Sequence, residues 1–390
     1  MQITQLNLPA TMIDLGVGQP DPTLLPLALI RQAADHRLRQ EDPSLLQYGT
    51  EPGNGFFRRE LARFLSGGYG VAVDPDRLFV TAGATSGLDL VCNRFTKPGD
   101  TVFVEEPTYF LALRLFADHR LNVVGLPIDE NGLVVEALEE KLADIRPVIL
   151  YTVPTFHNPS GVTLTASRRE HLVRLSEQHG FYVVADEVYH LLAYTSVPPP
   201  PLVSYDASGT VISLGSFSKI LAPGLRLGWI QTGPDLIRRM TRSGLLLSGG
   251  GMNPFTSAIV QSAVELGLQR EHLNRLIGIY RQRAADFEAA LNETLSASTT
   301  FIAPGGGFFF WIRLSQDLDA ATLRDRAKRN GVNFQPGINF SAGGKLRNFM
   351  RLCFVYYDSD RLREGVRRLA AVILMKALPN RPFSGSKQRC

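Results

Sequence analysis

Several polar residues with complementary chemistry follow the apolar runs of this chain. Asp186 ends the run FYVVAD, Lys219 follows TVISLGSFS, and Asn158 follows PVILYTVP. Further residues at the ends of such runs are Gly83, Ala84, Thr85, Tyr109, Ser216 and Ser218. In an open parallel sheet, ligands bind beyond the carboxyl ends of the strands. We therefore expect an acid, a lysine, an amide, two hydroxyls, an aromatic ring and a helix N-terminus to converge on one edge.

This set of groups fits a phosphorylated pyridine aldehyde. A lysine at a strand exit can form an imine with an aldehyde cofactor. A buried carboxylate can hold a pyridine nitrogen protonated, which makes the ring an electron sink. A helix N-terminus together with hydroxyls and an arginine binds phosphate, and Tyr109 can stack on a flat ring. The residues together predict a site for pyridoxal 5′-phosphate.

Alternating strands and helices must position these groups. Strands are expected over 79–83, 100–106, 120–128, 147–154, 181–189 and 210–219. Helices are expected over 83–95, 108–119, 135–145, 167–180 and about 265–292, and a Gly-rich loop over 248–257. This alternation is typical of an α/β fold with a mostly parallel sheet covered by helices on both faces.

The length of 390 residues favours two lobes. We expect an N-terminal segment (1–40) that joins a smaller α+β domain (281–380), a large domain (41–280) and a basic tail (381–390). The large domain would carry the cofactor, because all the strand-end residues lie within it.

Composition excludes several other classes of protein. Lys and Arg number 41 against 37 Asp and Glu, a spread-out net charge of +4 that does not favour nucleic-acid binding. Cys92, Cys353 and Cys390 form neither metal-ligand spacing nor an even disulfide framework, so we expect inert thiols, no metal and a reducing cytoplasm. We identify neither a signal peptide nor an apolar run long enough for a membrane span.

Six motifs resemble fold-type I pyridoxal-phosphate-dependent aminotransferases of class I/II. They are SFSKILAPGLRLGW (216–229), ADEVY (185–189), PTFHNPSG (154–161), EEPTYF (105–110), VTAGATSGLDL (80–90) and MRLCF (350–354). The chain looks closest to the aminoadipate/kynurenine aminotransferase branch and to the aminotransferase-like domain of MocR-type regulators. The resemblance spans roughly residues 13 to 370 and implies a seven-stranded-type sheet.

The resemblance also implies residue roles. Lys219 corresponds to the Schiff-base lysine that moves the proton between the substrate Cα and C4′ of the cofactor. Asp186 would pair with the ring nitrogen, Asn158 and Tyr189 with the ring oxygen, and Tyr109 would stack on the ring. Ser216, Ser218, Arg226 and the backbone of Gly83, Ala84 and Thr85 would hold the phosphate. Arg351 would bind the substrate carboxylate, with Asn158 and the N–H of Gly18 beside it. Tyr48 would reach the partner subunit's phosphate, which implies a homodimer.

Some residues depart from the family or admit other interpretations. Relatives often have Ser-Gln where this chain has Ala84-Thr85, and His157 beside Asn158 has no assigned role. Asn253 and Thr256 are candidates for contacts with the partner's cofactor, and Arg31 is a candidate for a distal substrate carboxylate. Alternatively, Asp186 is a helix N-cap, Arg351 a salt-bridged arginine, Tyr109 plain core, and Lys219 or Arg31 a solvated residue.

The expected reaction is transfer of an amino group from an L-amino acid to a 2-oxo acid by a ping-pong mechanism. The family expectation is that 2-oxoglutarate and glutamate form one pair. The alternatives are a carbon–sulfur β-lyase or a decarboxylase-like activity on the same fold, and a non-catalytic protein that senses pyridoxal phosphate. The sensing proteins carry a DNA-binding unit ahead of this domain, and we expect no room for one before residue 15.

Overall fold

The large sheet has the predicted alternation of parallel strands. The structure, a computed structural model, describes residue 9 and residues 11–374, so the predicted basic tail and Cys390 lie outside the described residues. The sheet has the order β2 (Leu78–Thr81), β9 (Gly228–Gln231), β8 (Val211–Ser216), β7 (Tyr182–Asp186), β6 (Ile149–Thr152), β3 (Thr101–Glu106), β4 (Asn122–Asp129) and β5 (Gly132–Leu133). Seven of these strands form the expected sheet, and β5 adds a two-residue edge.

The strand directions bring distant segments to one edge. β8, β7, β6, β3 and β4 are mutually parallel, whereas β9 runs antiparallel to both β8 and β2. The carboxyl ends of β2, β3, β6, β7 and β8 therefore share an edge with the amino end of β9. This reversal places Arg226, just before β9, beside residues that follow the other strands.

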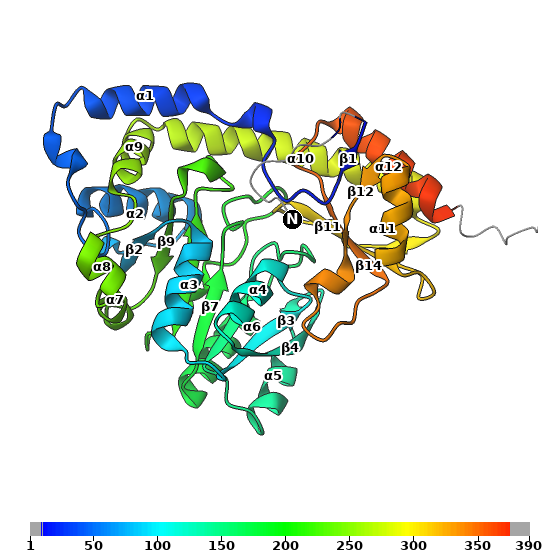
Figure 1. The fold of residues 1–390 in the computed structure, drawn as a ribbon, viewed down its shortest axis with the longest axis horizontal. Coiled ribbons are helices and arrows are strands. Elements are labelled where there is room, and N and C mark those ends of the chain that lie inside the picture. Colours follow the sequence, from blue (N-terminus) through cyan, green and yellow to red (C-terminus); the bar gives the residue numbers. More distant parts are fainter. Residues whose placement is uncertain (1–8, 10, 375–390) are drawn as a thin grey trace, which may run out of the picture.

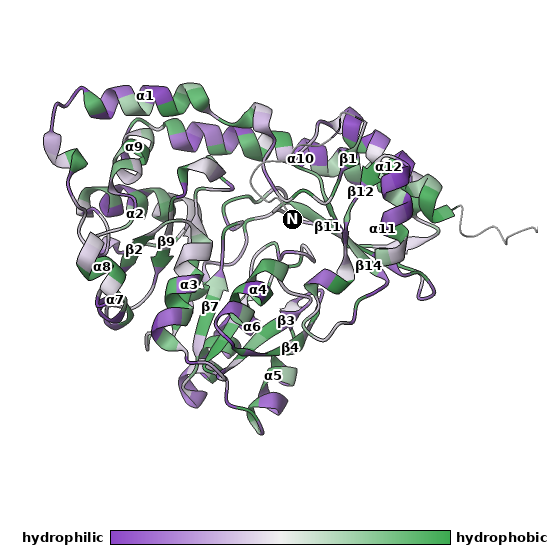
Figure 2. Cartoon of the chain, viewed as in Figure 1, coloured by the Kyte–Doolittle hydropathy of each residue, from purple (hydrophilic) through white to green (hydrophobic). Residues whose placement is uncertain are grey.

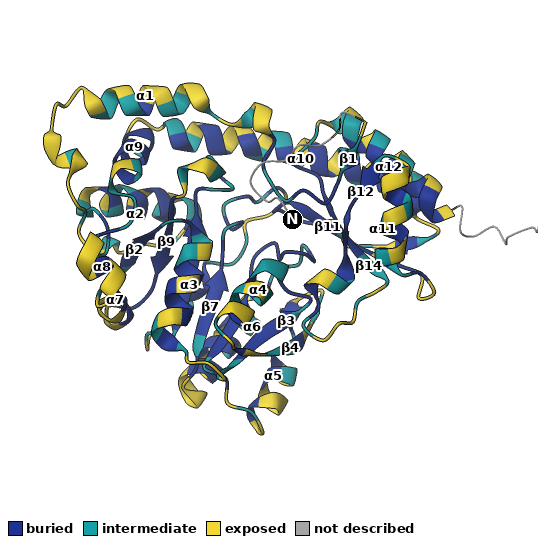
Figure 3. Cartoon of the chain, in the orientation of Figure 1, coloured by how far each residue is buried: buried dark blue, intermediate teal, exposed yellow. Residues whose placement is uncertain are grey.

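Helices cover both faces of this sheet, as predicted (Figure 1). One face packs against α3 (Ala84–Phe95), α4 (Phe110–Asp118) and α7 (Pro234–Thr241), and the other against α5 (Val135–Leu142) and α6 (Ala166–His179). Neighbouring residues such as Val102 and Phe103 point into different cores, yet both are fully buried. Burial on both faces explains why the strands are continuous apolar runs, and Figures 2 and 3 show them as hydrophobic and buried ribbons.

A second, smaller sheet lies in the C-terminal part of the chain. Its strands, all paired antiparallel, have the order β10 (Thr299–Thr300), β11 (Phe309–Leu314), β14 (Phe349–Cys353) and β13 (Gln335–Pro336). It is accompanied by α11 (Ala320–Arg329) and α12 (Ser359–Leu374). The N-terminal β1 (Ile13–Asp14) pairs in parallel with β12 (Val332–Asn333), so the start of the described chain joins this part. The fold class is confirmed, while the exact domain boundaries stay a prediction.

The remaining helices confirm one expectation and correct another. The helix predicted over about 265–292 is present as α10 (Leu268–Leu295), and Gly267, with a positive φ of 74°, separates it from α9 (Pro254–Glu265). The predicted loop over 248–257 is partly helical, since α8 (Gly244–Gly249) ends within it and α9 begins within it. α2 (Gly55–Tyr69) and α1 (Leu27–Leu38) pack on α9. In the described part of the chain, no helix is both long and apolar enough to cross a bilayer.

Candidate active site

Lys219 lies in the turn directly after β8, where the sequence predicts it. Its Nζ donates a hydrogen bond to the Gly18 carbonyl at 3.0 Å and lies 5.5 Å from the ring centre of Phe308. Burial disfavours the ammonium form and lowers the pKa of Lys219 to about 8. A lysine with this pKa supplies a useful fraction of neutral amine near pH 8, as a nucleophile or proton acceptor requires.

Asp186 is the last residue of β7, and its carboxylate is nearly excluded from solvent. Tyr151 donates to its Oδ2 at 2.7 Å, while its Oδ1 has no hydrogen-bond partner. Burial raises the pKa of Asp186, and the Tyr151 hydrogen bond and the charge of Lys219 oppose that rise. A buried, unpaired carboxylate oxygen fits a protonated ring nitrogen as its missing partner. The segment after Asp186 is a turn rather than a helix, so the N-cap interpretation is wrong.

The phosphate-binding end is built from β2, β8 and the segment before β9. Gly83, with φ of 91°, is the N-cap of α3 and leaves the first N–H groups of that helix without a side-chain cap. A Cβ at Gly83 would lie 2.7 Å from Nη2 of Arg226, so only glycine allows the arginine this close. The Ser216 and Ser218 hydroxyls are hydrogen-bonded to each other at 2.9 Å. This cradle of N–H groups, hydroxyls and a guanidinium fits a phosphate.

Arg351 lies on β14 of the smaller sheet, beside Asn158 and Gly16. Its Nη1 donates to Oδ1 of Asn158 at 3.0 Å and its Nη2 to the Gly16 carbonyl at 2.8 Å, while the buried Nε has no partner. The nearest ring, Phe309, has its centre 4.0 Å from the guanidinium carbon. Among the described residues no carboxylate forms an ion pair with Arg351, so the salt-bridge interpretation is wrong. A cation that is buried and lacks a counter-charge suits a substrate carboxylate.

The other predicted ring and backbone groups lie in the same region. Tyr109 is the N-cap residue of α4, and burial beside Asp186 raises its pKa to about 12. Tyr189 is buried and packs against Phe308 and Phe309 at ring-centre distances of 5.3 and 5.9 Å. A Cβ at Gly18 would lie 3.4 Å from Nη2 of Arg351, which places this glycine beside the arginine.

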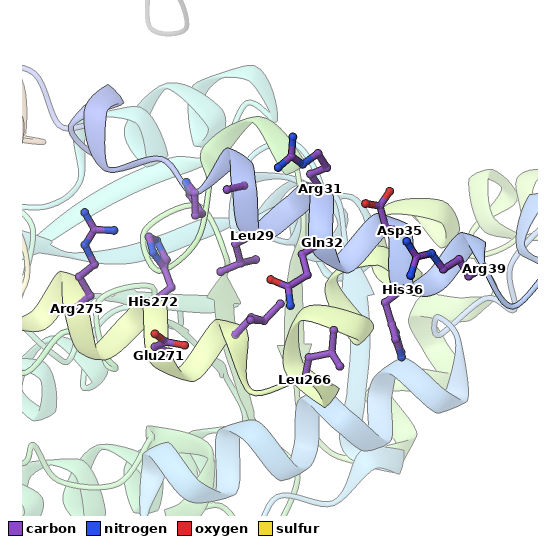
Figure 4. Close-up of a pocket in the computed structure, with 13 residues that line it drawn as sticks. Leu29, Arg31, Gln32, Asp35, His36, Arg39, Leu266, Glu271, His272 and Arg275 are labelled. Carbon is purple, nitrogen blue, oxygen red and sulfur yellow. The ribbon is translucent and has the colours of Figure 1, made fainter.

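Arg31 and Tyr48 lie apart from this cluster. Arg31 is exposed on α1 and lines a groove of about 860 Å³ whose lining includes none of the other predicted site residues. Figure 4 shows it pointing away from His272 of α10. Tyr48 is 82% exposed. Asn253 lies nearer, because its side-chain amide donates to the Arg226 carbonyl, whereas Thr256 lies in the first turn of α9.

Sequence reasoning missed two buried contacts. Tyr151, the partner of Asp186, is hidden in the apolar run PVILYTVP, where a tyrosine suggests only packing. The Nε2 atom of His157 lies 3.0 Å from Oε2 of Glu105, close enough for an ion pair when the imidazole is protonated. The His157 Nδ1 accepts from Ser160, so this histidine braces the loop that carries Asn158. In the sequence, the position of His157 directly before Asn158 was the one feature that drew attention to this residue.

The comparisons with known proteins agree with this geometry. Residues 10–369 match the family described as aminotransferase class I and II. Aromatic-amino-acid aminotransferase 1 of Thermococcus litoralis is 35% identical over 95% of this chain and 90% of its own length. Proteins named as HTH-type transcriptional regulators also match, one from Bacillus subtilis at 26% identity over 95% of this chain and 76% of its own.

Two crystal structures are similar over nearly the whole chain. Kynurenine aminotransferase of Pyrococcus horikoshii, in complex with PMP, has a TM-score of 0.89 at 35% identity and covers 95% of this chain and 92% of its own. LysN of Thermus thermophilus, an α-aminoadipate aminotransferase complexed with N-(5′-phosphopyridoxyl)-L-leucine, has a TM-score of 0.85 at 30% identity, with 95% and 94% covered.

The match confirms the predicted resemblance and its cofactor. Together with the unpaired Asp186 oxygen, the phosphate cradle and the half-buried lysine, it shows that this chain belongs to the class I and II aminotransferase family and is a pyridoxal-phosphate-dependent aminotransferase.

Proposed function

We propose that this chain moves the amino group of an L-amino acid to a 2-oxo acid by a ping-pong mechanism that depends on Lys219. 2-Oxoglutarate and glutamate are one proposed pair. The observation that carries the proposal is the position of the Lys219 amine, with a pKa lowered to about 8, in one site with the unpaired Asp186 oxygen and the Arg351 guanidinium. These three groups are the base, the ring partner and the carboxylate anchor that the reaction needs.

Each residue contributes a distinct task. Bound pyridoxal phosphate supplies an electron-withdrawing ring that stabilises negative charge at the substrate Cα. Lys219 takes the Cα proton and returns it at C4′ of the cofactor. The Asp186 Oδ1 keeps the ring nitrogen protonated, and Arg351 binds the α-carboxylate. Residues that hold the cofactor are Gly83, Ala84, Thr85, Ser216, Ser218 and Arg226 at the phosphate, Tyr109 on the ring, and Asn158 and Tyr189 at the ring oxygen.

The surroundings of Arg351 support an apolar or aromatic donor. Phe309, Phe340 and Phe110 lie 4.0, 5.0 and 5.7 Å from its guanidinium carbon. Such a wall favours an apolar side chain by excluding water from it. The relatives named for aromatic amino acids and kynurenine support the same class of donor. Arg31 lines a different groove, which weighs against a dedicated arginine for acidic donors at that position.

We also propose a homodimer in which Tyr48 reaches the partner's cofactor phosphate. The exposed side chains of Leu46, Tyr48 and Phe56 support this, because three large apolar groups on one short segment favour a covered surface. The location in a reducing cytoplasm also stays a prediction, which agrees with the buried, unbridged thiols of Cys92 and Cys353.

Replacing Lys219 by Ala should abolish transamination, since no other amine among the described residues occupies that position. The measurement is oxo-acid formation from phenylalanine with 2-oxoglutarate as acceptor, together with bleaching of the visible absorption of the bound cofactor. Transamination by Lys219→Ala at the wild-type rate would show that the assignment is wrong. Release of pyruvate and ammonia from a cysteine-type substrate by the wild type would favour the lyase instead.

Replacing Arg351 by Ala should raise KM and lower kcat/KM by about 100-fold or more, as expected for loss of a charged hydrogen-bonded contact. Arg351→Lys keeps the charge without the forked geometry and should recover part of the loss. Steady-state kinetics reports the interaction with the substrate, and cofactor absorption reports how much cofactor is bound. Measuring both distinguishes a loss of substrate binding from a loss of cofactor. Normal kcat/KM in Arg351→Ala with unchanged cofactor content would refute the carboxylate role.

The stability of the cofactor-free protein should rise with pH between about 8 and 10.5, to the extent that Lys219 controls it. The folded pKa is about 8 against an ordinary value of 10.5, so in this window the unfolded chain binds more protons. The free energy of unfolding of wild type minus Lys219→Met should therefore increase with pH, by about 3 kcal/mol at most. Urea unfolding at a series of pH values measures it, with exposed Lys97→Met as control. Parallel curves for wild type and Lys219→Met would contradict the buried-amine assignment.

Tyr48→Ala should weaken cofactor binding by about ten-fold, although Tyr48 is exposed in its own chain, because it removes a contact with phosphate across the interface. Equilibrium dialysis gives the affinity, and sedimentation velocity gives the assembly. Tyr48→Phe separates the hydroxyl from the ring. Wild-type affinity in a dimeric Tyr48→Ala protein would mean that the cross-subunit contact does not exist.

A further inference from the structure

Tyr151 and Asp186 form a buried pair on neighbouring strands. β6 and β7 pair in parallel with Tyr151 opposite Val184, so Tyr151 and Asp186 point to the same face of the sheet. The Tyr151 hydroxyl donates to Oδ2 of Asp186 at 2.7 Å, and Oδ1 has no hydrogen-bond partner. We propose that Tyr151 is a positioning residue that fixes the Asp186 carboxylate with Oδ1 turned to the cofactor's ring nitrogen and thereby keeps the ring proton on that nitrogen.

The environment of Tyr151 makes this hydrogen bond hard to replace. Its side chain is fully buried, and the ring of Phe116 packs edge-on against it with centres 5.6 Å apart. Water cannot substitute for the hydroxyl in such a site. Burial and the nearby Asp186 charge hold the pKa of Tyr151 well above its ordinary value, so the phenol remains a donor.

The direction of the effect follows from proton affinity. A hydrogen bond donated to a carboxylate stabilises its charged form. Without the Tyr151 hydroxyl, Asp186 would bind a proton more strongly and take it from the ring nitrogen. The ring would then be a weaker electron sink, and loss of the Cα proton would slow.

Other groups around Asp186 do not duplicate this contact. Those whose charges or backbone act on it are Lys219, His157, Tyr109, Tyr189 and the N–H of Val188. Among the described side chains, Tyr151 is the one with a hydrogen bond to the Asp186 carboxylate. The neighbouring charges stay in place when Tyr151 is replaced, so the effect of its hydroxyl can be isolated.

The inference rests on the proposed role of Asp186, and the experiment tests the two separately. Holoenzyme carrying cofactor labelled with ¹⁵N in the ring is titrated with pH by NMR, and kcat is measured in parallel. The variants are Tyr151→Phe, Asp186→Asn and the double variant. Phe116→Leu is the packing control. Tyr280→Phe is the control for losing a buried hydroxyl, because the Tyr280 hydroxyl has no partner.

In Tyr151→Phe, a smaller fraction of the ring nitrogen should carry the proton at a given pH than in wild type, because part of it moves to Asp186, and kcat should fall about ten-fold, as for loss of a hydrogen bond to a charged group. Asp186→Asn should lose ring protonation throughout, and adding Tyr151→Phe to it should cause no further loss of kcat. Tyr280→Phe and Phe116→Leu should titrate like wild type.

Three results would overturn the proposal. A wild-type titration in Tyr151→Phe, with protonation lost in Asp186→Asn, would remove Tyr151 alone and leave the Asp186 role standing. A shift in Phe116→Leu equal to that in Tyr151→Phe would reduce Tyr151 to a packing residue. A wild-type titration in Asp186→Asn would instead show that the proposed Asp186 role itself is wrong. The double variant has no unpaired buried charge, so it remains informative if Tyr151→Phe folds poorly.

Discussion

The site depends on a carboxylate that the fold keeps away from water. Asp186 is buried and its Oδ1 has no hydrogen-bond partner. Such a group is costly unless a cation or a donor compensates it. The chain supplies one hydroxyl and a nearby lysine, and no arginine pairs with Asp186 among the described residues. One apolar layer on each face of the sheet holds β7 in place. The fold therefore tolerates the Asp186 Oδ1, whose hydrogen-bond partner must come from a ligand.

The N-terminal segment connects the parts of the site that the large sheet alone cannot bring together. The Leu15 carbonyl accepts from the backbone N–H of Cys353 at 2.6 Å. The Gly16 carbonyl accepts from Arg351 and the Gly18 carbonyl from Lys219. A buried salt bridge of 2.7 Å between Asp21 and Arg283 ties the end of this segment to α10. Four residues of one short segment therefore set the spacing between the amine and the substrate arginine.

The sequence predicted the residues at strand ends well, for a physical reason. Parallel strands buried on both faces appear as apolar runs, and the polar residue that ends each run is easy to recognise, as with Asp186 and Lys219. Contacts inside the runs were not predictable, since Tyr151 in a strand shows no sign of its hydroxyl partner. Helix α9 was also missed, because its first residues lie in the Gly-rich stretch 248–257, whose composition indicated a loop.

Two buried arginines have different partners and therefore different roles, one in supporting the fold and one in binding an anion. Arg169 is fully buried and donates to the carbonyls of Leu164, Pro200 and Pro154 and to the Thr155 hydroxyl, with Glu187 3.4 Å away.

Arg351 is almost as deeply buried, but it has an unpaired Nε and no carboxylate beside it among the described residues. Three phenylalanine rings surround it instead. Aromatic faces attract a guanidinium without neutralising it. The first arginine has its counter-charge within the fold and braces the loop that carries Asn158, whereas the second keeps its positive charge available for an anion that the substrate brings.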